Sequence, residues 1–439
     1  MTKVITYGTY DFLHEGHIRL LKRAKALGDY LIVGVTADDF DMARGKINVG
    51  QSLMERVEAI RQTGLADKII IEEYEGQKID DIRRYEADIF TVGSDWVGKF
   101  DYLNEFCKVV YLDRTEGISS TEIRSHRQEL RIGLVGETNI VNKFKNECRY
   151  VNGVEIAGVY ASTSGTLDNE LKNLTSRTSS YDELLCKCNA VYIASKPSEH
   201  YHQVKKALES GAHVICESPI TLDIEQFDEL IHIASEKGLV LMDGIKTAYS
   251  LAFNRMMLLI KAGIIGDVLS VDTTCTSLID IDKNNLPSHL WNSITAWGPT
   301  ALLPIFKILG TDFKQTMRYS KSLPNHKDFD IFTKVSFIYD NGVASIKVGQ
   351  GVKSEGEMVI SGTKGYIYVP APWWKTDYFE VRYENSSENK RYFYQLDGEG
   401  IRYEILSFIN LIKGRKSYNQ VSEEISQQII RIVGNTGEG

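Results

Sequence analysis

The stretch that decides the fold of this chain is Gly8-Thr9-Tyr10-Asp11-Phe12-Leu13-His14-Glu15-Gly16-His17. It follows the apolar run Val4–Tyr7 and leads into the amphipathic run Ile18–Leu27, which is the order strand, glycine turn, helix. In this order, backbone N–H groups and the positive end of the helix dipole gather where the helix begins. The stretch therefore predicts a phosphate-binding turn.

Two histidines at this helix start, His14 and His17, are three positions apart, so both side chains project to one side and reach the same phosphate. A transferring phosphoryl group needs its developing charge stabilised more than it needs covalent help, and imidazole donors suit that role. The alternative is that the two histidines only cap a helix. An isolated pair of histidines with this spacing is usually a cap. The choice between phosphate binding and capping therefore depends on the whole ten-residue run.

The first third of the chain alternates short apolar runs with amphipathic stretches. Strands that alternate with helices predict a parallel, doubly wound α/β domain. The charged segment Thr121–Arg131 shows no buried pattern after its first turn, so we place the end of this domain at residue 127. The runs are Val4–Tyr7, Ile18–Leu27, Leu31–Val35, Met54–Thr63, Lys68–Ile71, Ile79–Tyr85, Ile89–Val92 and Val109–Leu112.

A second run, Arg114-Thr115-Glu116-Gly117-Ile118-Ser119-Ser120-Thr121, completes a pattern with the first. Together they resemble the signatures G-T-F-D-x-x-H-x-G-H and R-T-x-G-I-S-T-T of the cytidylyltransferase-like nucleotidyltransferases, with Ser120 in place of a threonine. Gly93–Asp101 and Val109–Leu112 are similar to the bacterial glycerol-3-phosphate branch in particular. The resemblance implies an enzyme that joins CTP to glycerol 3-phosphate or a similar polyol phosphate, giving CDP-glycerol and pyrophosphate.

The resemblance assigns catalytic roles to four residues: His14, His17, Lys46 and Arg114. Arg44 stands where the family keeps a lysine, and a guanidinium binds phosphate bidentately rather than as a point charge. Without the resemblance, this basic loop would be read as a solvated face. Contacts with CTP and its phosphates are assigned to Gly8, Thr9, Tyr10, Asp11, Gly16, Arg44, Arg56, Thr115, Gly117, Ile118, Ser119, Ser120 and Thr121.

The role of Asp11 stays open between three alternatives. It orients a histidine, helps to place the Mg²⁺ that we expect with CTP, or caps the helix as aspartates often do. The sequence gives no certain metal site. Its six cysteines are scattered and lack the paired spacing of a zinc site.

The rest of the chain predicts two further domains, at residues 131–245 and 246–439. The first has short apolar runs separated by the helix-like stretches Ser198–Ser210 and Ile224–Lys237, which is typical of a Rossmann domain. The second has longer runs of period two and turns such as Asp340-Asn341-Gly342, which predict a mostly antiparallel sheet. We expect Arg402–Lys413 to be a helix lying on one side of that sheet.

From Arg131 to about Gly434 the chain resembles the glucose-fructose oxidoreductase and inositol dehydrogenase family, carried mainly by the run Ala190–Pro219. This implies an NAD(P)-binding Rossmann domain followed by an α+β domain with an open antiparallel sheet. The family's reaction residues are largely replaced. Of its G-x-G-x-x-G fingerprint, Gly136 remains and Thr138 replaces the second glycine. Ala161 stands in place of the ribose-binding acid, and Ser218 in place of the lysine of the E-K-P motif. Thr300 and Leu303 replace a later histidine and aspartate.

Three interpretations of this half stay open: a binding or assembly module without hydride transfer, which we favour, a ligand sensor, and a reductase that supplies the polyol phosphate. In a reductase, Lys246 is the best proton donor, although a lone lysine after a strand is usually solvated. NADP rather than NAD would be its cofactor, because Ala161 replaces the ribose-binding acid and the following Ser162 and Thr163 can hydrogen-bond a 2′-phosphate. The candidate oxidoreductase site comprises Gly136, Ser162, His200, Glu217 and Lys246.

Composition limits the partners. A net charge of −8 and a pI near 5.7 argue against nucleic-acid binding, since phosphate backbones favour a basic surface. The N-terminal residues contain no basic segment followed by a cleavable apolar one, and no apolar stretch is long enough to span a membrane. We therefore expect a cytoplasmic protein without membrane insertion. Both resemblances imply a homo-oligomer, and the first implies a product used for a surface polymer such as teichoic acid or capsule.

Overall fold

The structure is a computed structural model in which the chain divides into two compact units. The first comprises residues 1–129 with Tyr150–Gly153, and the second comprises Leu130–Arg149 and Val154–Gly439. The residues that the structure describes are 1–37, 51, 53–74, 76–113, 130–151, 153–161, 167, 171, 178, 180–279, 291–394, 396–415 and 420–434.

The first unit has a five-stranded sheet in the order β3-β2-β1-β4-β5, with every pair parallel. Its strands are β1 (Lys3–Gly8), β2 (Tyr30–Thr36), β3 (Lys68–Glu72), β4 (Ile89–Gly93) and β5 (Lys108–Leu112). Its helices are α1 (Glu15–Lys25), α3 (Leu53–Gln62), α4 (Gln77–Tyr85) and the 3₁₀ turns η1 (Ser94–Trp96) and η2 (Asp101–Glu105). The predicted doubly wound fold is confirmed.

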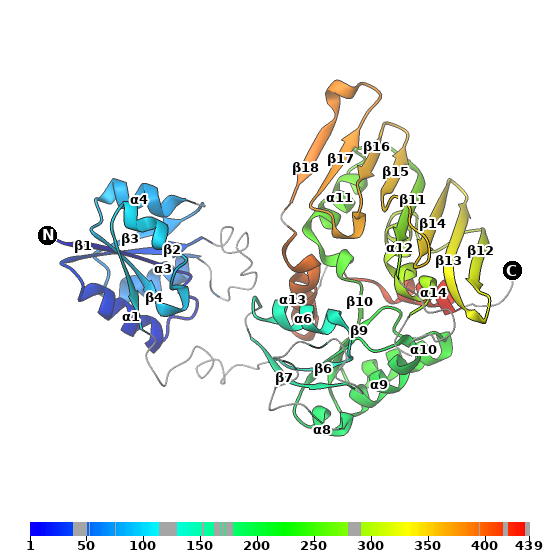
Figure 1. The fold of residues 1–439 in the computed structure, drawn as a ribbon, viewed down its shortest axis with the longest axis horizontal. Coiled ribbons are helices and arrows are strands. Elements are labelled where there is room, and N and C mark those ends of the chain that lie inside the picture. Colours follow the sequence, from blue (N-terminus) through cyan, green and yellow to red (C-terminus); the bar gives the residue numbers. More distant parts are fainter. Residues whose placement is uncertain are drawn as a thin grey trace. The chain divides into compact units, whose positions relative to one another are not determined.

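The two faces of this sheet carry separate cores because side chains alternate along a strand. Val4 of β1 packs in one cluster with Leu21 of α1 and Ile60 of α3. Its neighbour Ile5 packs in another with Ile82 of α4. Helices therefore cover both faces, as Figure 1 shows, and β1 lies in the centre with its carboxyl end at the turn quoted above.

The second unit begins with a parallel sheet in the order β10-β9-β8-β6-β7. The strands are β6 (Leu130–Val135), β7 (Val154–Tyr160), β8 (Ala190–Ile193), β9 (His213–Glu217) and β10 (Leu241–Gly244). The helices are α6 (Asn139–Cys148), α8 (Tyr181–Leu185), α9 (Pro197–Glu209), α10 (Ile224–Glu236) and the 3₁₀ turn η3 (Lys246–Tyr249). The predicted Rossmann-type order of strands and helices is confirmed.

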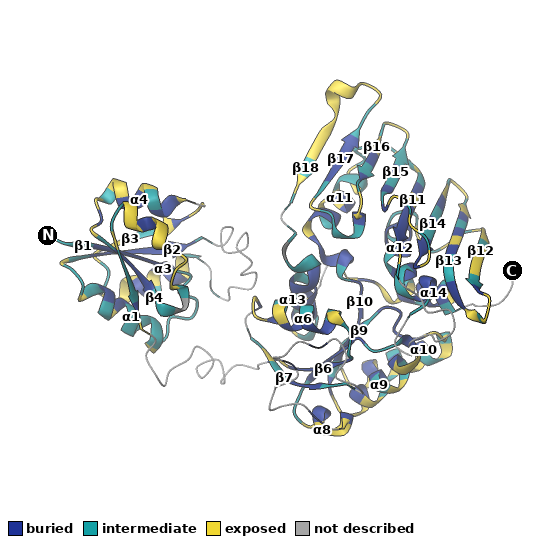
Figure 2. Ribbon diagram, viewed as in Figure 1, coloured by how far each residue is buried: buried dark blue, intermediate teal, exposed yellow. Residues whose placement is uncertain are grey.

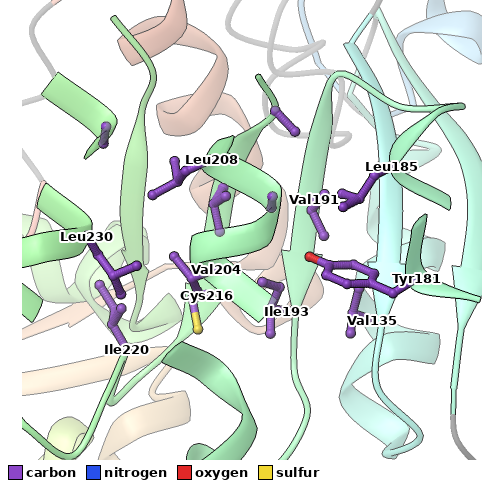
Figure 3. Packing of buried hydrophobic residues seen from close by; sticks show 14 of the residues in the cluster. Val135, Tyr181, Leu185, Val191, Ile193, Val204, Leu208, Cys216, Ile220 and Leu230 are labelled. Atoms are coloured by element: carbon purple, nitrogen blue, oxygen red, sulfur yellow. The ribbon is translucent and has the colours of Figure 1, made fainter. Parts of the chain in front are cut away.

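One core of this sheet lies beneath α8, α9 and α10. Val191 and Ile193 of β8 pack there with Val204 and Leu208 of α9 and Leu230 of α10, as Figure 3 shows. The outward faces of α9 and α10 are exposed whereas the strands are buried (Figure 2). The apolar periodicity of these helices therefore follows directly from one-sided burial.

Gly136, the surviving fingerprint glycine, is needed for packing within the fold. Its φ angle is 128°, and a Cβ there would lie 2.6 Å from the carbonyl oxygen of Ala194. The end of β6 and the residue after β8 thus approach too closely for any side chain. Packing within the sheet is therefore enough to explain why Gly136 is retained, and binding of a dinucleotide is not needed for it.

The remaining sheet has eight strands in the order β12-β13-β14-β11-β15-β16-β17-β18. It is antiparallel as predicted except for one parallel pair, β11 with β14, so the sheet is mixed. The hairpin expected at Asp340–Asn341 joins β13 to β14, with Tyr339 paired to Gly342. The strands are β11 (Val268–Thr276), β12 (Gln315–Leu323), β13 (His326–Tyr339), β14 (Gly342–Gly349), β15 (Met358–Gly362), β16 (Tyr366–Val369), β17 (Tyr378–Arg382) and β18 (Lys390–Phe393).

The predicted helix at Arg402–Lys413 forms but does not lie on this sheet. It is α13, which contacts α6 and η3, and its Phe408 meets the ring of His213 edge-on at 6.4 Å. It thus covers the Rossmann sheet. The eight-stranded sheet is covered by α12, where Thr273 of β11 donates to the carbonyl of Ala301. The other helices are α11 (Leu251–Lys261), α12 (Ser293–Leu309), α13 (Ile401–Ile412), α14 (Glu423–Gly434), η4 (Trp373–Lys375), η5 (Ser386–Glu388) and η6 (Asp397–Gly400).

The described ranges contain neither a membrane-spanning helix nor a cluster of metal ligands. No helix there is long and apolar enough to cross a membrane. No group of three or more histidine, cysteine, aspartate or glutamate side chains is placed there to hold a metal ion. All six cysteines of the chain are free thiols.

Candidate functional site

The turn between β1 and α1 has an uncommon backbone. Tyr10 and Phe12 have φ angles of 53° and 46°, which residues with a Cβ rarely adopt. Two hydrogen bonds with Gln51 hold this shape: the Gln51 amide donates to Oδ1 of Asp11 (3.0 Å), and the Phe12 amide donates to Oε1 of Gln51 (2.7 Å). Asp11 therefore ties the turn to the segment before α3.

His14, not Asp11, is the N-cap of α1, so the capping alternative for Asp11 is wrong. Nδ1 of His14 accepts the amide hydrogen of Gly16 at 3.1 Å, which leaves the proton of the neutral ring on Nε2. The ring of His17 stacks on that of His14, with centroids 3.8 Å apart, and Tyr10 packs edge-on against His17. The two imidazoles thus lie together at the helix start, as their spacing indicates.

Arg56 lies beneath this turn and is fully buried. Its Nη1 donates to the carbonyls of Thr9 (2.7 Å) and Thr36 (2.8 Å), and its Nε donates to the carbonyl of Gln51 (3.2 Å). These contacts join the ends of β1 and β2 to the start of α3. They fix the floor of the turn, while the contact of Arg56 with CTP stays a prediction.

Gln51 and Arg23 complete the arrangement, and neither was expected from the sequence. Arg23 of α1 donates to the carbonyl of Asp113, which follows β5 and directly precedes Arg114 (2.6 Å). Neither residue belongs to a motif, so no signal would have found them. The expected residues Arg44, Lys46, Arg114, Thr115, Gly117, Ile118, Ser119, Ser120 and Thr121 lie outside the described residues.

This geometry suits an oxyanion of phosphorus. A helix N-terminus offers unpaired N–H groups and a positive dipole end, and two imidazoles beside it can donate to oxygens that gain charge.

Comparison with known proteins decides the family. A cytidylyltransferase-like family model matches residues 5–126. The glycerol-3-phosphate cytidylyltransferase of Bacillus spizizenii is 47% identical over 130 residues, which is 30% of this chain and 100% of that protein. The chain belongs to the cytidylyltransferase-like family. A second relative within the family, the glycerol-3-phosphate cytidylyltransferase of Bacillus subtilis, is 48% identical over 124 residues, covering 28% of this chain and 95% of that protein.

The cytidylyltransferase-like chain also carries the candidate oxidoreductase site, whose described side chains contact residues outside the predicted set. His200 is fully buried, with Nδ1 2.8 Å from the carbonyl of Pro219 and Nε2 2.9 Å from that of Ser195. Burial lowers the pKa of His200, although its contacts with the two carbonyls act in the opposite direction. These contacts tie α9 to two loops.

Acidic groups and one lysine lie at the carboxyl ends of β9 and β10. Oε1 of Glu217 accepts from the hydroxyl of Tyr192 at 2.5 Å. Burial raises the pKa of Glu217, raises that of Glu404 further above its usual value, and raises that of Asp243 to about 6. Nζ of Lys246 lies 2.6 Å from Oε2 of Glu399.

The described residues do not fit the dinucleotide-binding pattern. Thr138 is the N-cap of α6, yet its side chain makes no capping bond, and its buried hydroxyl has no hydrogen bond to any described residue. The glycine that normally stands there lets the pyrophosphate approach the backbone. Of the candidate site, Ser162 lies outside the described residues.

The fold of this half has clear counterparts. An oxidoreductase family model with an NAD-binding Rossmann fold matches residues 130–245. A UDP-N-acetylglucosamine 3-dehydrogenase from Acidithiobacillus ferrooxidans superposes with a TM-score of 0.58 at 19% identity, covering 69% of this chain and 95% of the other. A 3-ketoreductase from Actinomadura kijaniata, solved with NADP and TDP-benzene, gives 0.58 at 15% identity, again with 69% and 95% coverage. These likenesses show the fold.

Arg56→Lys should loosen the first site. A lysine ammonium cannot donate to three carbonyls in the planar pattern of a guanidinium. Leaving a buried acceptor unsatisfied costs about 1–3 kcal/mol. We expect the free energy of local opening at β1 and β2 to fall by that amount, measured by amide hydrogen exchange of their peptides.

The matched control is Arg61→Lys on the exposed face of α3, where the side chain pairs with Glu58. It should leave the exchange of both strands unchanged. Equal exchange in the two variants would contradict the role given to Arg56.

Proposed function

We propose that residues 1–127 form a glycerol-3-phosphate cytidylyltransferase, which joins CTP to glycerol 3-phosphate, or a similar polyol phosphate, to give CDP-glycerol and pyrophosphate. The observation that carries this proposal is the pair of stacked imidazoles of His14 and His17 at the N-terminus of α1. Complete coverage of a relative of that name at 47% identity supports the substrate.

In the proposed reaction, a phosphate oxygen of the acceptor attacks the α-phosphorus of CTP in line, and the bond to pyrophosphate breaks. The donors of this chain stabilise charge on the phosphoryl oxygens and do not attack. In the neutral ring of His14 the proton is on Nε2, since Nδ1 accepts from the amide of Gly16. We assign the remaining phosphates to Lys46, Arg114 and the hydroxyls that follow it. Mg²⁺ enters as the partner of CTP, and no step depends on a protein metal site.

Substitutions at the two histidines separate chemistry from stability. His17→Ala should lower kcat by about 10²–10³-fold, because it removes a donor used chiefly in the transition state. His14→Asn should lower kcat similarly yet keep the midpoint of thermal unfolding, since asparagine is a favourable N-cap. Pyrophosphate release from CTP and glycerol 3-phosphate measures both.

The control is His232→Ala, because His232 lies on the exposed face of α10, with 71% of its side chain accessible. It should release pyrophosphate at the wild-type rate. Near-wild-type turnover of His17→Ala would contradict the proposal that the histidine pair forms the active site.

The nucleotide preference tests the family branch. We expect kcat/KM for CTP to exceed those for ATP, GTP and UTP by at least about tenfold, because pockets that hydrogen-bond a base reject analogues with misplaced donors. A preference for ATP would instead indicate an adenylyltransferase.

We propose that the second half is a binding or assembly module without hydride transfer. Thr138 replaces the pyrophosphate-facing glycine, and Ser218 replaces the proton-donating lysine. A serine hydroxyl is too weak an acid to act as the donor, and general acid catalysis contributes about 10²–10⁴-fold. The NADP-bound relative keeps the second candidate open: an NADP-dependent reductase that supplies the polyol phosphate.

The full chain should therefore show no measurable oxidation of NADH or NADPH with dihydroxyacetone phosphate or related keto-phosphates. NADPH fluorescence reports binding, and its absorbance reports turnover. Turnover of NADPH that disappears in Lys246→Ala would contradict the binding-module proposal and favour the reductase.

We further propose a cytoplasmic homo-oligomer with domains at 1–127, 131–245 and 246–439, whose product is used for teichoic acid or capsule. The family match from residue 5 to 126 and the next from 130 to 245 support the first two domains. The glycerol-3-phosphate relatives from Bacillus support the product class.

A further inference from the structure

Three lysine side chains converge on one carboxylate in the second unit. Nζ of Lys143 and Nζ of Lys375 each lie 2.8 Å from Oε1 of Glu399, and Nζ of Lys246 lies 2.6 Å from Oε2. The amines come from α6, η4 and η3, at sequence separations of 256, 24 and 153 residues from Glu399. The fold therefore concentrates three positive charges in a small volume.

This cluster has more positive than negative charge. In the described part of the chain, no second carboxylate lies within ion-pair distance of the three amines. The nearby Glu147 is already paired with Arg402 at 2.7 Å. Lys246 also faces Glu217 and Glu404, but burial raises the pKa of both carboxyls, which favours their neutral forms.

Glu399 behaves toward the lysines as a bound anion does. Burial alone would raise the pKa of its carboxyl, but hydrogen bonds from Lys143, Lys246 and Lys375 outweigh burial and hold the pKa well below its usual range. The group is therefore ionised throughout the neutral range, and it satisfies amines that would otherwise repel one another.

The backbone presses this carboxylate into the cluster. Gly398, Glu399 and Gly400 have consecutive positive φ angles of 57°, 54° and 91°. A Cβ on Gly400 would lie 2.6 Å from the carbonyl oxygen of Lys246, and one on Gly398 would meet the side chain of Glu147. The two glycines thus bring the chain close enough for Glu399 to reach all three amines.

The cluster lies where this type of fold receives ligands. Lys246 follows the carboxyl end of β10, and Lys143 lies on the helix that follows β6. Open α/β sheets bind ligands in the crevice outside the carboxyl ends of their strands. The side chains of Lys143, Lys246, Lys375 and Glu399 keep 37%, 21%, 35% and 24% of their exposure, so solvent reaches the amines.

We propose that Lys143, Lys246 and Lys375 form a binding site for a phosphomonoester, and that Glu399 occupies this site as an internal substitute for the ligand. The phosphomonoester displaces the carboxylate, which swings away from the amines. This proposal does not depend on cytidylyl transfer by residues 1–127.

The charge and the donors select the ligand class. A phosphomonoester carries about −1.5 to −2 at pH 7 and presents three strong acceptor oxygens, one for each amine. A monocarboxylate carries a single charge and gains nothing over Glu399, which the chain itself holds at high effective concentration. Inorganic phosphate and the phosphate of a polyol share the required chemistry.

Tryptophan fluorescence of the full chain tests the site. Trp374 directly precedes Lys375 and has its ring centroid 4.9 Å from that of Trp297. A Trp96→Phe background removes the one tryptophan within residues 1–129. In that background we titrate inorganic phosphate, glycerol 3-phosphate and acetate. Glu399→Gln should lower the Kd of both phosphates at least tenfold, and acetate should remain the weaker ligand in both proteins.

Matched variants control this titration. Glu388→Gln, at a carboxylate in η5 outside the cluster, should leave every Kd unchanged. Lys375→Met added to Glu399→Gln should raise the Kd at least tenfold again. Glu399→Asp, which withdraws the carboxylate while keeping its charge, should lower the Kd by a smaller factor and serves if the glutamine variant does not fold.

Two results would overturn the proposal: equal Kd values with glutamate, glutamine and aspartate at position 399, or a Kd that is insensitive to Lys375→Met. Similar affinities for the two phosphates would identify the phosphate group alone as the ligand. Tighter binding of glycerol 3-phosphate would identify the polyol ester. Either of these supports the site.

Discussion

The first site depends on how one buried guanidinium is satisfied. Arg56 donates to the carbonyls of Thr9, Thr36 and Gln51, which belong to the ends of two strands and the start of a helix. A buried charge that loses its partners destabilises a fold by several kcal/mol. The three backbone segments must therefore stay where the guanidinium can reach them. Because the turn from Thr9 leads directly to His14, the stacked imidazoles take their position from this arrangement.

In the second unit, the residues that form the apolar core differ from those of the candidate reaction site. Its cores are apolar side chains, such as Val191 and Leu208, and they need no cofactor to pack. Two of its charged groups have partners inside the protein: Lys246 pairs with Glu399, and Glu217 accepts from Tyr192. A fold of this kind can therefore stay packed whether or not it keeps the reaction of its family.

Sequence periodicity predicted the two α/β sheets well, because one-sided burial leaves a regular pattern. The same pattern at 402–413 predicted a helix but not its neighbour, since amphipathicity shows that a face is buried and not what covers it. The histidine pair was predictable because both residues stand in one short motif. Gln51 was not, and neither was the meeting of Lys143 with Glu399, because such contacts arise only when distant segments are brought together by the fold.

The close approach at Gly136 has a consequence for how such chains evolve. A side chain there would force the backbone of Ala194 away and open the sheet, whether or not a dinucleotide is bound. Selection for a folded domain alone would therefore preserve this glycine, with or without selection for a cofactor. The side-chain hydroxyl of Thr138, two positions later, makes no hydrogen bond to any described residue, so this side chain is free of that requirement. In related sequences, substitution of the second fingerprint glycine while the first is retained would indicate a domain that has kept its fold and changed its function.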